Sequence, residues 1–212
     1  MPFDNLYTPD YSPFVVHFTK SHRMVREDLL VEGDSLFLHR HAAAKDRLIS
    51  ILRDRTIHAS PMPFLPTDRR AVCFTECIWD GLARLAGEYS AYGVVFSKRL
   101  IFDLRGGPAL YLRGDTLSTI GDKIPQELHP FIAPFDPEAT LKPGVRLDYL
   151  HEREWRLPDS LAFQYSDIEY VLVESIEDAS GVVHQIGAQQ LPESKVIPMA
   201  VYRNIKQAWR SQ

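Results

Sequence analysis

The sequence predicts an α+β fold in a single domain that spans residues 1–212. Its length and its 45% hydrophobic content suffice for one large domain with a buried core, or for two small ones. Fifteen prolines against eleven glycines indicate many stiff turns and connections, which disfavours a helix bundle. Short β-type runs alternate with helical stretches, without an internal repeat or a clear linker, so one domain is preferred.

The first half of the chain is predicted to begin with an N-terminal arm at residues 1–12, where no periodicity is visible. The best helical pattern covers 42–55, because Leu48, Ile51 and Leu52 share one helix face. The other predicted elements here are strands at 14–19, 69–76 and 92–96 and helices at about 21–32 and 79–89.

The second half is predicted to contain the most strand-like run of the chain, IEYVLV at 168–173. Residues 133–144 are punctuated by prolines and predict a loop that could contact a partner. The other predicted elements are a turn and strand within 105–115, one or two helices at 116–132, strands at about 152–157 and 194–202, and a C-terminal helix.

Composition limits the class of protein. A net charge of −4 and a pI of about 6.1 argue against a chain held on nucleic acid by bulk charge, although a local basic groove stays possible. The N-terminus lacks the pattern of a signal peptide, and no apolar run reaches the ~20 residues that span a bilayer. With only Cys73 and Cys77, a disulfide framework is not expected. We therefore expect a cytoplasmic protein without a membrane partner.

No metal site is expected. The two histidines of HRH at 39–41 have no cysteine or carboxylate at metal spacing, and Cys73 and Cys77 have no second ligand pair. The chain has neither a Walker-type glycine loop nor a GxSxG elbow.

The polar run HEREWRLP begins at residue 151. In a strand, Glu152, Glu154 and Arg156 would project to one face and Trp155 to the other. Two carboxylates about 6.5–7 Å apart could act on one bound molecule, one stabilising a cationic sugar transition state and the other orienting or deprotonating an acceptor. The alternative is a surface pair of Glu154 with Arg156 that contributes little.

Other polar residues lie at strand ends. His17 stands in an apolar strand with Thr19 on its own face, and such a histidine is more often a hydrogen-bonded core residue than a catalytic one. Thr75 ends a strand, where either a catalytic role or helix capping is possible. Tyr89 and Tyr92 flank the start of the next strand.

The order of five segments resembles the AbiGi-like group of bacterial abortive phage-infection proteins. These segments are HFT (17–19), CFTE (73–76), EYSAYGVVFSK (88–98), GGPALYL (106–112) and EREWRLP (152–158). The resemblance implies a role in antiviral defence through abortive infection, as part of a toxin–antitoxin system with a cognate toxin or antitoxin partner.

A more distant resemblance indicates a type of reaction. The histidine in the first strand, the threonine that ends a middle strand and the late ExE together resemble the signature of ADP-ribosyltransferases. EREWRLPDSLAF followed by IEYVLV is similar to the end of DarT-type toxins, which attach ADP-ribose to DNA bases. The resemblance implies an ADP-ribosyltransferase-like split β-sheet core with flanking helices, and NAD as substrate. By position, Glu154 would be the catalytic glutamate and Glu152 the first acidic member of ExE.

The same resemblance implies the NAD-binding residues. His17 and Thr19 would hold the adenosine-side ribose or the nicotinamide amide, Thr75 would support the glutamate, and Tyr89 or Tyr92 would stack on nicotinamide. Two departures are visible: the middle motif is FTE rather than Ser-Thr-Ser, and the arginine-rich segment of DarT-type enzymes has only a loose equivalent, in Lys98, Arg99, Arg105 and Arg113.

Three hypotheses result. The leading one is an NAD-dependent ADP-ribosyltransferase, a toxin or phage-defence effector, that modifies a nucleic-acid or protein acceptor. The alternative is a non-enzymatic antitoxin or immunity protein that keeps the fold, contacts its partner through 133–144 and the N-terminal arm, and uses Glu152, Glu154 and Arg156 as a structural ion-pair row. A metal-independent nuclease that uses His17 is less favoured.

Overall fold

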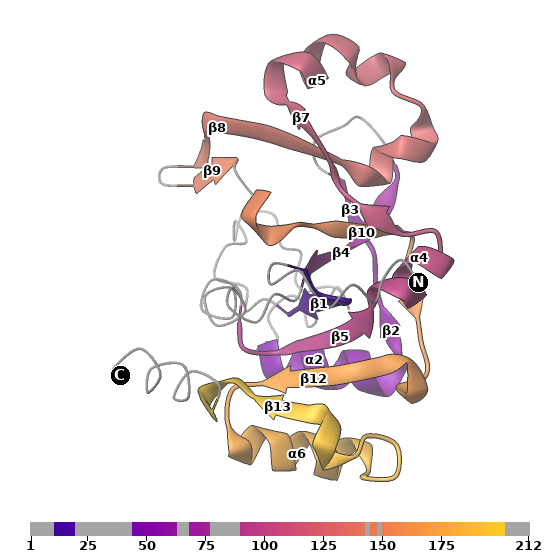
Figure 1. Ribbon diagram of the computed structural model, residues 1–212, viewed down its shortest axis with the longest axis vertical. Coiled ribbons are helices and arrows are strands. Elements are labelled where there is room, and N and C mark those ends of the chain that lie inside the picture. Colours follow the sequence, from indigo (N-terminus) through magenta and orange to yellow (C-terminus); the bar gives the residue numbers. More distant parts are fainter. Residues whose placement is uncertain are drawn as a thin grey trace, which may run out of the picture. The chain divides into compact units, whose positions relative to one another are not determined.

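The computed structural model describes residues 11–19, 44–62, 68–76, 90–142, 145–147 and 150–201. The chain divides into two compact units. Unit 1 comprises 1–15, 56–76 and 97–162, and unit 2 comprises 16–55, 77–96 and 163–212. Both units combine helices with strands (Figure 1), which confirms the prediction of a mixed helix-and-sheet fold. The predicted helices at 21–32 and 79–89, the C-terminal helix and Tyr89 lie outside the described residues.

Unit 2 is built on a mixed sheet. The strand order is β13 (Val196–Pro198), β12 (Ile168–Val173), β5 (Gly93–Ser97) and β1 (Phe14–Phe18). Unit 2 contains β13 and β12 completely, residues 93–96 of β5 and residues 16–18 of β1. β12 runs antiparallel to β5 and parallel to β13, with Val171 opposite both Val94 and Val196. The parallel pair needs a crossover, which helix α6 (Ile176–Ile186) provides.

Two helices of unit 2 are amphipathic. Helix α2 (Ala44–Asp54) buries Leu48 and Leu52 as predicted, and Ile51 is half-buried. Helix α6 was not predicted from the sequence. Its start is fixed by Ser175, whose hydroxyl oxygen accepts a hydrogen bond from the backbone N–H of Asp178.

The centre of unit 1 is an antiparallel arrangement in which β10 (Trp155–Pro158) lies between β4 (Arg70–Glu76) and β6 (Gly107–Pro108). Trp155 is opposite Phe74 of β4. β3 (Ser60–Pro61) pairs with β4, and β2 (Thr56–Ile57) pairs with β11 (Leu161–Ala162). The short helix α4 (Lys98–Asp103) follows β5 and is capped by Ser97.

The predicted strand at 152–157 is wrong in its first part. Leu150–Glu152 forms a 3-10 turn (η4), and Arg153 has a left-handed backbone with φ of 47°. This turn breaks the alternation of faces before Trp155, so Glu152 and Glu154 do not belong to one strand.

A second sheet of unit 1 has the order β7 (Leu110–Arg113), β8 (Ile132–Lys142) and β9 (Val145–Leu147). β7 is parallel to β8, and the connection between them holds α5 (Gly114–Ile120), η2 (Gly121–Lys123) and η3 (Gln126–Phe131).

The predicted loop at 133–144 is therefore wrong, because most of it is β8. Pro137 falls in the irregular step between Asp136 and Thr140, where the pairing with β9 is interrupted, so its missing N–H breaks no regular ladder bond.

Within the described ranges, no helix is long and apolar enough to cross a bilayer.

Candidate functional site

Thr75 and Glu152 come together in unit 1, although 77 positions separate them in the chain. Thr75 lies near the end of β4 and Glu152 ends the turn η4, and their exposed fractions are only 6% and 7%. The Thr75 hydroxyl is 3.4 Å from Oε2 of Glu152 and donates to it. The expected threonine–glutamate contact therefore exists, but to Glu152, the first acidic residue of ExE.

Glu154 is held by Arg156 in a bidentate ion pair. Nε and Nη2 of Arg156 each lie 3.0 Å from one carboxylate oxygen of Glu154. Two parallel charge-assisted bonds of this kind fix the orientation of a carboxylate as well as its charge. Burial alone would lower the pKa of Arg156, but the hydrogen bonds and charge of Glu154 outweigh it and raise that pKa above its usual value.

The Glu154–Arg156 pair differs from the expected surface pair. Only 12% of the Glu154 side chain and 5% of the Arg156 side chain are exposed. Nη1 of Arg156 also donates to the carbonyl oxygen of Ile132, at 2.6 Å, and lies 3.4 Å from that of Pro130. The pair is thus part of the interior of unit 1.

Tyr111 of β7 lies beside Glu154. Its hydroxyl oxygen accepts a weak hydrogen bond from the backbone N–H of Glu154, at 3.4 Å. Burial, followed by the charge of Glu154, raises the pKa of Tyr111 to about 12. The phenol is therefore neutral at physiological pH and can serve as a polar wall beside the glutamate.

A second buried ion pair, which was not predicted, joins Glu76 to Lys98 at 2.9 Å. Burial lowers the pKa of Lys98 although Glu76 opposes the shift. The Lys98 ammonium also lies 4.2 Å from the ring centre of Tyr11 and 5.4 Å from that of Trp155, within the range of cation–π attraction. The backbone N–H of Ser12 donates to Oε1 of Glu76 at 2.9 Å, so this part of the N-terminal arm is fixed to unit 1.

Four basic residues loosely match the arginine-rich segment of DarT-type enzymes, and three of them form ion pairs with carboxylates. Lys98 is buried against Glu76. Arg99 pairs with Asp103 and Arg113 pairs with Asp115, and both pairs are on the surface. Arg105 has a left-handed backbone with φ of 69° in the turn after α4.

The other predicted site residues belong to unit 2. Thr19 is buried, and its hydroxyl lies 2.8 Å from the carbonyl oxygen of Ala44 and 3.2 Å from that of Tyr92. The Tyr92 hydroxyl donates to Asp178 at 2.8 Å, and burial together with Asp178 raises the pKa of Tyr92. His17 is half-buried in β1, two residues before Thr19. The structure therefore brings Thr19 and Tyr92 together, in a network that also holds the sheet to α2 and α6.

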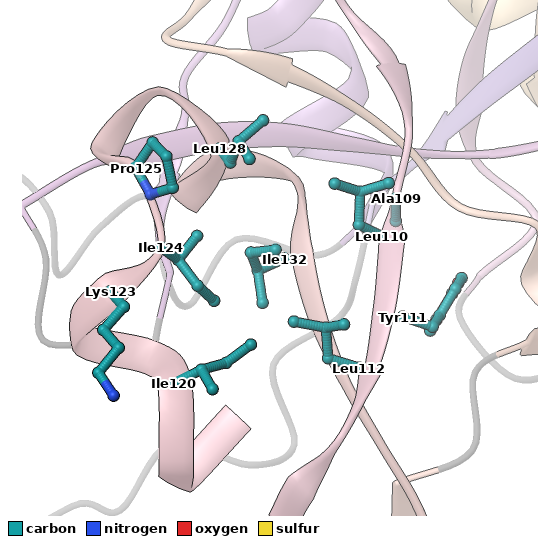
Figure 2. A pocket seen from close by; sticks show the side chains of 10 residues that line it. All are labelled: Ala109, Leu110, Tyr111, Leu112, Ile120, Lys123, Ile124, Pro125, Leu128 and Ile132. Carbon is teal, nitrogen blue, oxygen red and sulfur yellow. The ribbon is translucent and has the colours of Figure 1, made fainter. Parts of the chain in front are cut away.

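A cavity of about 540 Å³ lies in the second sheet of unit 1, between β7 and the turns that precede β8. Figure 2 shows that Leu110 and Leu112 point toward it, with Ile124 and Ile132 opposite, whereas Tyr111 points to the other side of β7. The described lining is almost wholly apolar, and Lys123 is the only charged residue among these lining residues. The segment GGPALYL was noted in the sequence, but nothing in its pattern predicted a hollow.

Among the described residues, no group of three His, Cys, Asp or Glu side chains could hold a metal ion. No family model matches the chain, and neither a curated protein nor a solved structure gives a significant match.

Proposed function

We propose that this chain is an NAD-dependent ADP-ribosyltransferase, a toxin or phage-defence effector that modifies a nucleic-acid or protein acceptor. The observation that carries the proposal is the contact of Thr75 with Glu152, two residues before the oriented carboxylate of Glu154. Two buried carboxylates with different partners are suited to two different roles in one reaction.

Each carboxylate has a role in the proposed reaction. The bond between nicotinamide and ribose breaks, its electron pair leaves with the nicotinamide, and positive charge develops on the sugar. Glu154 would stabilise this charge and accept a hydrogen bond from a ribose hydroxyl. A nitrogen or oxygen of the acceptor then bonds to the sugar carbon, and Glu152 would orient the acceptor or take its proton.

We further propose that the chain is related to the AbiGi-like group and to DarT-type enzymes. Its fold would then contain an ADP-ribosyltransferase-like split β-sheet core. The antiparallel β4–β10 pair supports it, because Thr75 lies near the end of β4 and Glu154 directly precedes β10. His17, Thr19 and Tyr92 remain the predicted NAD contacts, and NAD would have to displace the bonds that the Thr19 and Tyr92 hydroxyls make within unit 2. A cytoplasmic location and a cognate partner are part of the same proposal.

Labelled NAD tests this function directly. The wild-type chain, incubated with host or phage extract, should release nicotinamide and transfer label to an acceptor. Glu154→Gln and Glu152→Gln should each lower transfer by at least ~10²-fold. Glu127→Gln, at an exposed position of unit 1, is the matched control and should behave as the wild type. Wild-type protein that binds NAD but neither transfers label nor releases nicotinamide would contradict the proposal.

One observation favours the second candidate, a non-enzymatic antitoxin or immunity protein that keeps the fold. Arg156 bonds both oxygens of Glu154 inside unit 1, as a structural ion pair would. The segments expected to contact a partner differ from the prediction. Residues 133–142 lie in strand β8 and not in a loop, and Ser12 of the N-terminal arm is buried.

Glu154→Ala separates the two candidates in cells. If the chain is an enzyme toxin, its expression alone slows growth, and the variant abolishes that effect while the protein stays folded. If the chain is an antitoxin, the variant still protects cells from the cognate toxin.

A further inference from the structure

We propose that Arg156 is a positioning residue, which fixes the carboxylate of Glu154 in the orientation that the reaction uses. This inference rests on the proposed function, since it assigns Arg156 a role in the same site. It differs from the interpretation of the pair as a purely structural ion pair.

The geometry of the ion pair leaves Glu154 able to act. Nε of Arg156 bonds Oε1 of Glu154 and Nη2 bonds Oε2, each at 3.0 Å. An ionised carboxylate offers about four lone-pair sites, and two bonds from one guanidinium occupy two of them. The remaining sites can accept a ribose hydroxyl, and the fork determines the direction in which they point.

Arg156 is itself anchored by groups other than the glutamate. Its Nη1 donates to the carbonyl oxygen of Ile132, the first residue of β8, at 2.6 Å. The carbonyl oxygen of Pro130 and the sulfur of Met62 each lie 3.4 Å from the same nitrogen. The guanidinium therefore stays in place without a carboxylate partner, and it can transmit that fixed position to Glu154.

Lysine cannot reproduce this arrangement. The guanidinium bonds Glu154 through one edge and Ile132 through another, and this requires several donors in one rigid plane. A lysine has one nitrogen, which can keep the charge but not both sets of bonds. Arg99 pairs with Asp103 at the surface, and among the described residues no further acceptor anchors its guanidinium. This pair therefore serves as a control in which the arginine has no fixed position.

A double-mutant cycle on nicotinamide release from NAD tests the proposal. Arg156→Lys should lower kcat by ~10–10²-fold, while KM for NAD stays within about 3-fold, because a misplaced carboxylate affects the transition state more than binding. The double variant Glu154→Gln/Arg156→Lys should be no slower than Glu154→Gln alone, since Arg156 acts through Glu154. Arg99→Lys should match the wild type.

Two further variants control for stability. Ile101→Ala truncates a fully buried apolar side chain of unit 1, which has no polar atom that could bond the ion pair, and its kcat should stay within about 3-fold of wild type despite a lower Tm. Arg156→Gln replaces Arg156→Lys in the same cycle if the lysine variant does not fold.

The outcomes distinguish this inference from the function on which it rests. If the wild type is active and the kcat losses of Glu154→Gln and Arg156→Lys multiply in the double variant, Arg156 acts independently of Glu154. This result overturns the inference about Arg156 but not the proposed function. An active wild type with an unchanged Arg156→Lys variant overturns it as well. A wild type that binds NAD but releases no nicotinamide overturns the proposed function and the inference with it.

Discussion

Replacing Lys98 with methionine should strongly destabilise unit 1. The Lys98 ammonium is buried and lies 2.9 Å from the equally buried carboxylate of Glu76. Methionine fills much of the same volume but removes the positive charge, so the Glu76 carboxylate keeps its burial and loses its partner. The rings of Tyr11 and Trp155 lose their cation in the same step.

The expected loss of unfolding free energy in Lys98→Met follows from the burial of the Lys98–Glu76 ion pair. Breaking a buried ion pair by removing one partner costs about 3–5 kcal/mol. The free energy of unfolding of a domain is typically about 5–15 kcal/mol, so this loss is a large share of it. For a chain of this size it corresponds to a fall in Tm of ~6–20 °C. The double variant Glu76→Gln/Lys98→Met should recover at least ~2 kcal/mol, because no unpaired charge remains and the glutamine oxygen can still accept from Ser12.

Urea unfolding at neutral pH, followed by circular dichroism, measures these free energies. Arg99→Met is the matched control, because it breaks the ion pair between Arg99 and Asp103 in helix α4. Both of these side chains are more than half exposed, so the expected cost is about 0–1 kcal/mol. If Lys98→Met costs no more than Arg99→Met, or if the double variant is less stable than Lys98→Met alone, then the unpaired Glu76 charge does not cause the loss of stability.

Two other predictions concern pH and glycine positions. The pKa of Tyr111 is raised to about 12 in the folded chain against ~10 in the unfolded chain, so its contribution to stability is complete below pH ~10 and is lost as the pH rises to about 12. Unfolding of wild type and Tyr111→Phe across this range should show a smaller loss in the variant, and parallel curves would contradict the assignment. Gly93→Ala should cost ~1–3 kcal/mol, since its Cβ would lie 2.9 Å from the carbonyl oxygen of His17. Gly181→Ala should gain about 0.5–1 kcal/mol, because its Cβ would meet nothing within 4 Å in helix α6. Equal effects of the two substitutions on urea unfolding would exclude this explanation.

The elements that the sequence predicted well are those whose pattern is local. The apolar runs of β4, β5 and β12 and the helical face of α2 are visible within a few residues. All four are largely buried, although Ile51 of α2 is half-buried. Strand β8 was missed because its prolines suggest a loop, and only its partners β7 and β9 show that a strand can form there.

The candidate site could be predicted only in part, because its contacts join distant positions. Thr75 and Glu152 were both selected, but their contact to each other depends on how η4 follows the strand pair. The burial of Arg156 depends on the carbonyl oxygen of Ile132, which no side-chain pattern reveals. One signal was present for Lys98: a charged residue directly after the apolar run GVVFS is well placed for a buried ion pair.

The proposed function depends most directly on whether this chain binds NAD. A ligand that binds only the folded state at 100 times its Kd adds ~2.7 kcal/mol to the free energy of unfolding, which raises Tm by about 5–11 °C for a chain of this size. NAD at ~1 mM should produce such a rise in the wild type and in His184→Ala, an exposed histidine of the same unit, but not in His17→Ala. A wild-type Tm that stays unchanged even at about 10 mM NAD would contradict the proposal.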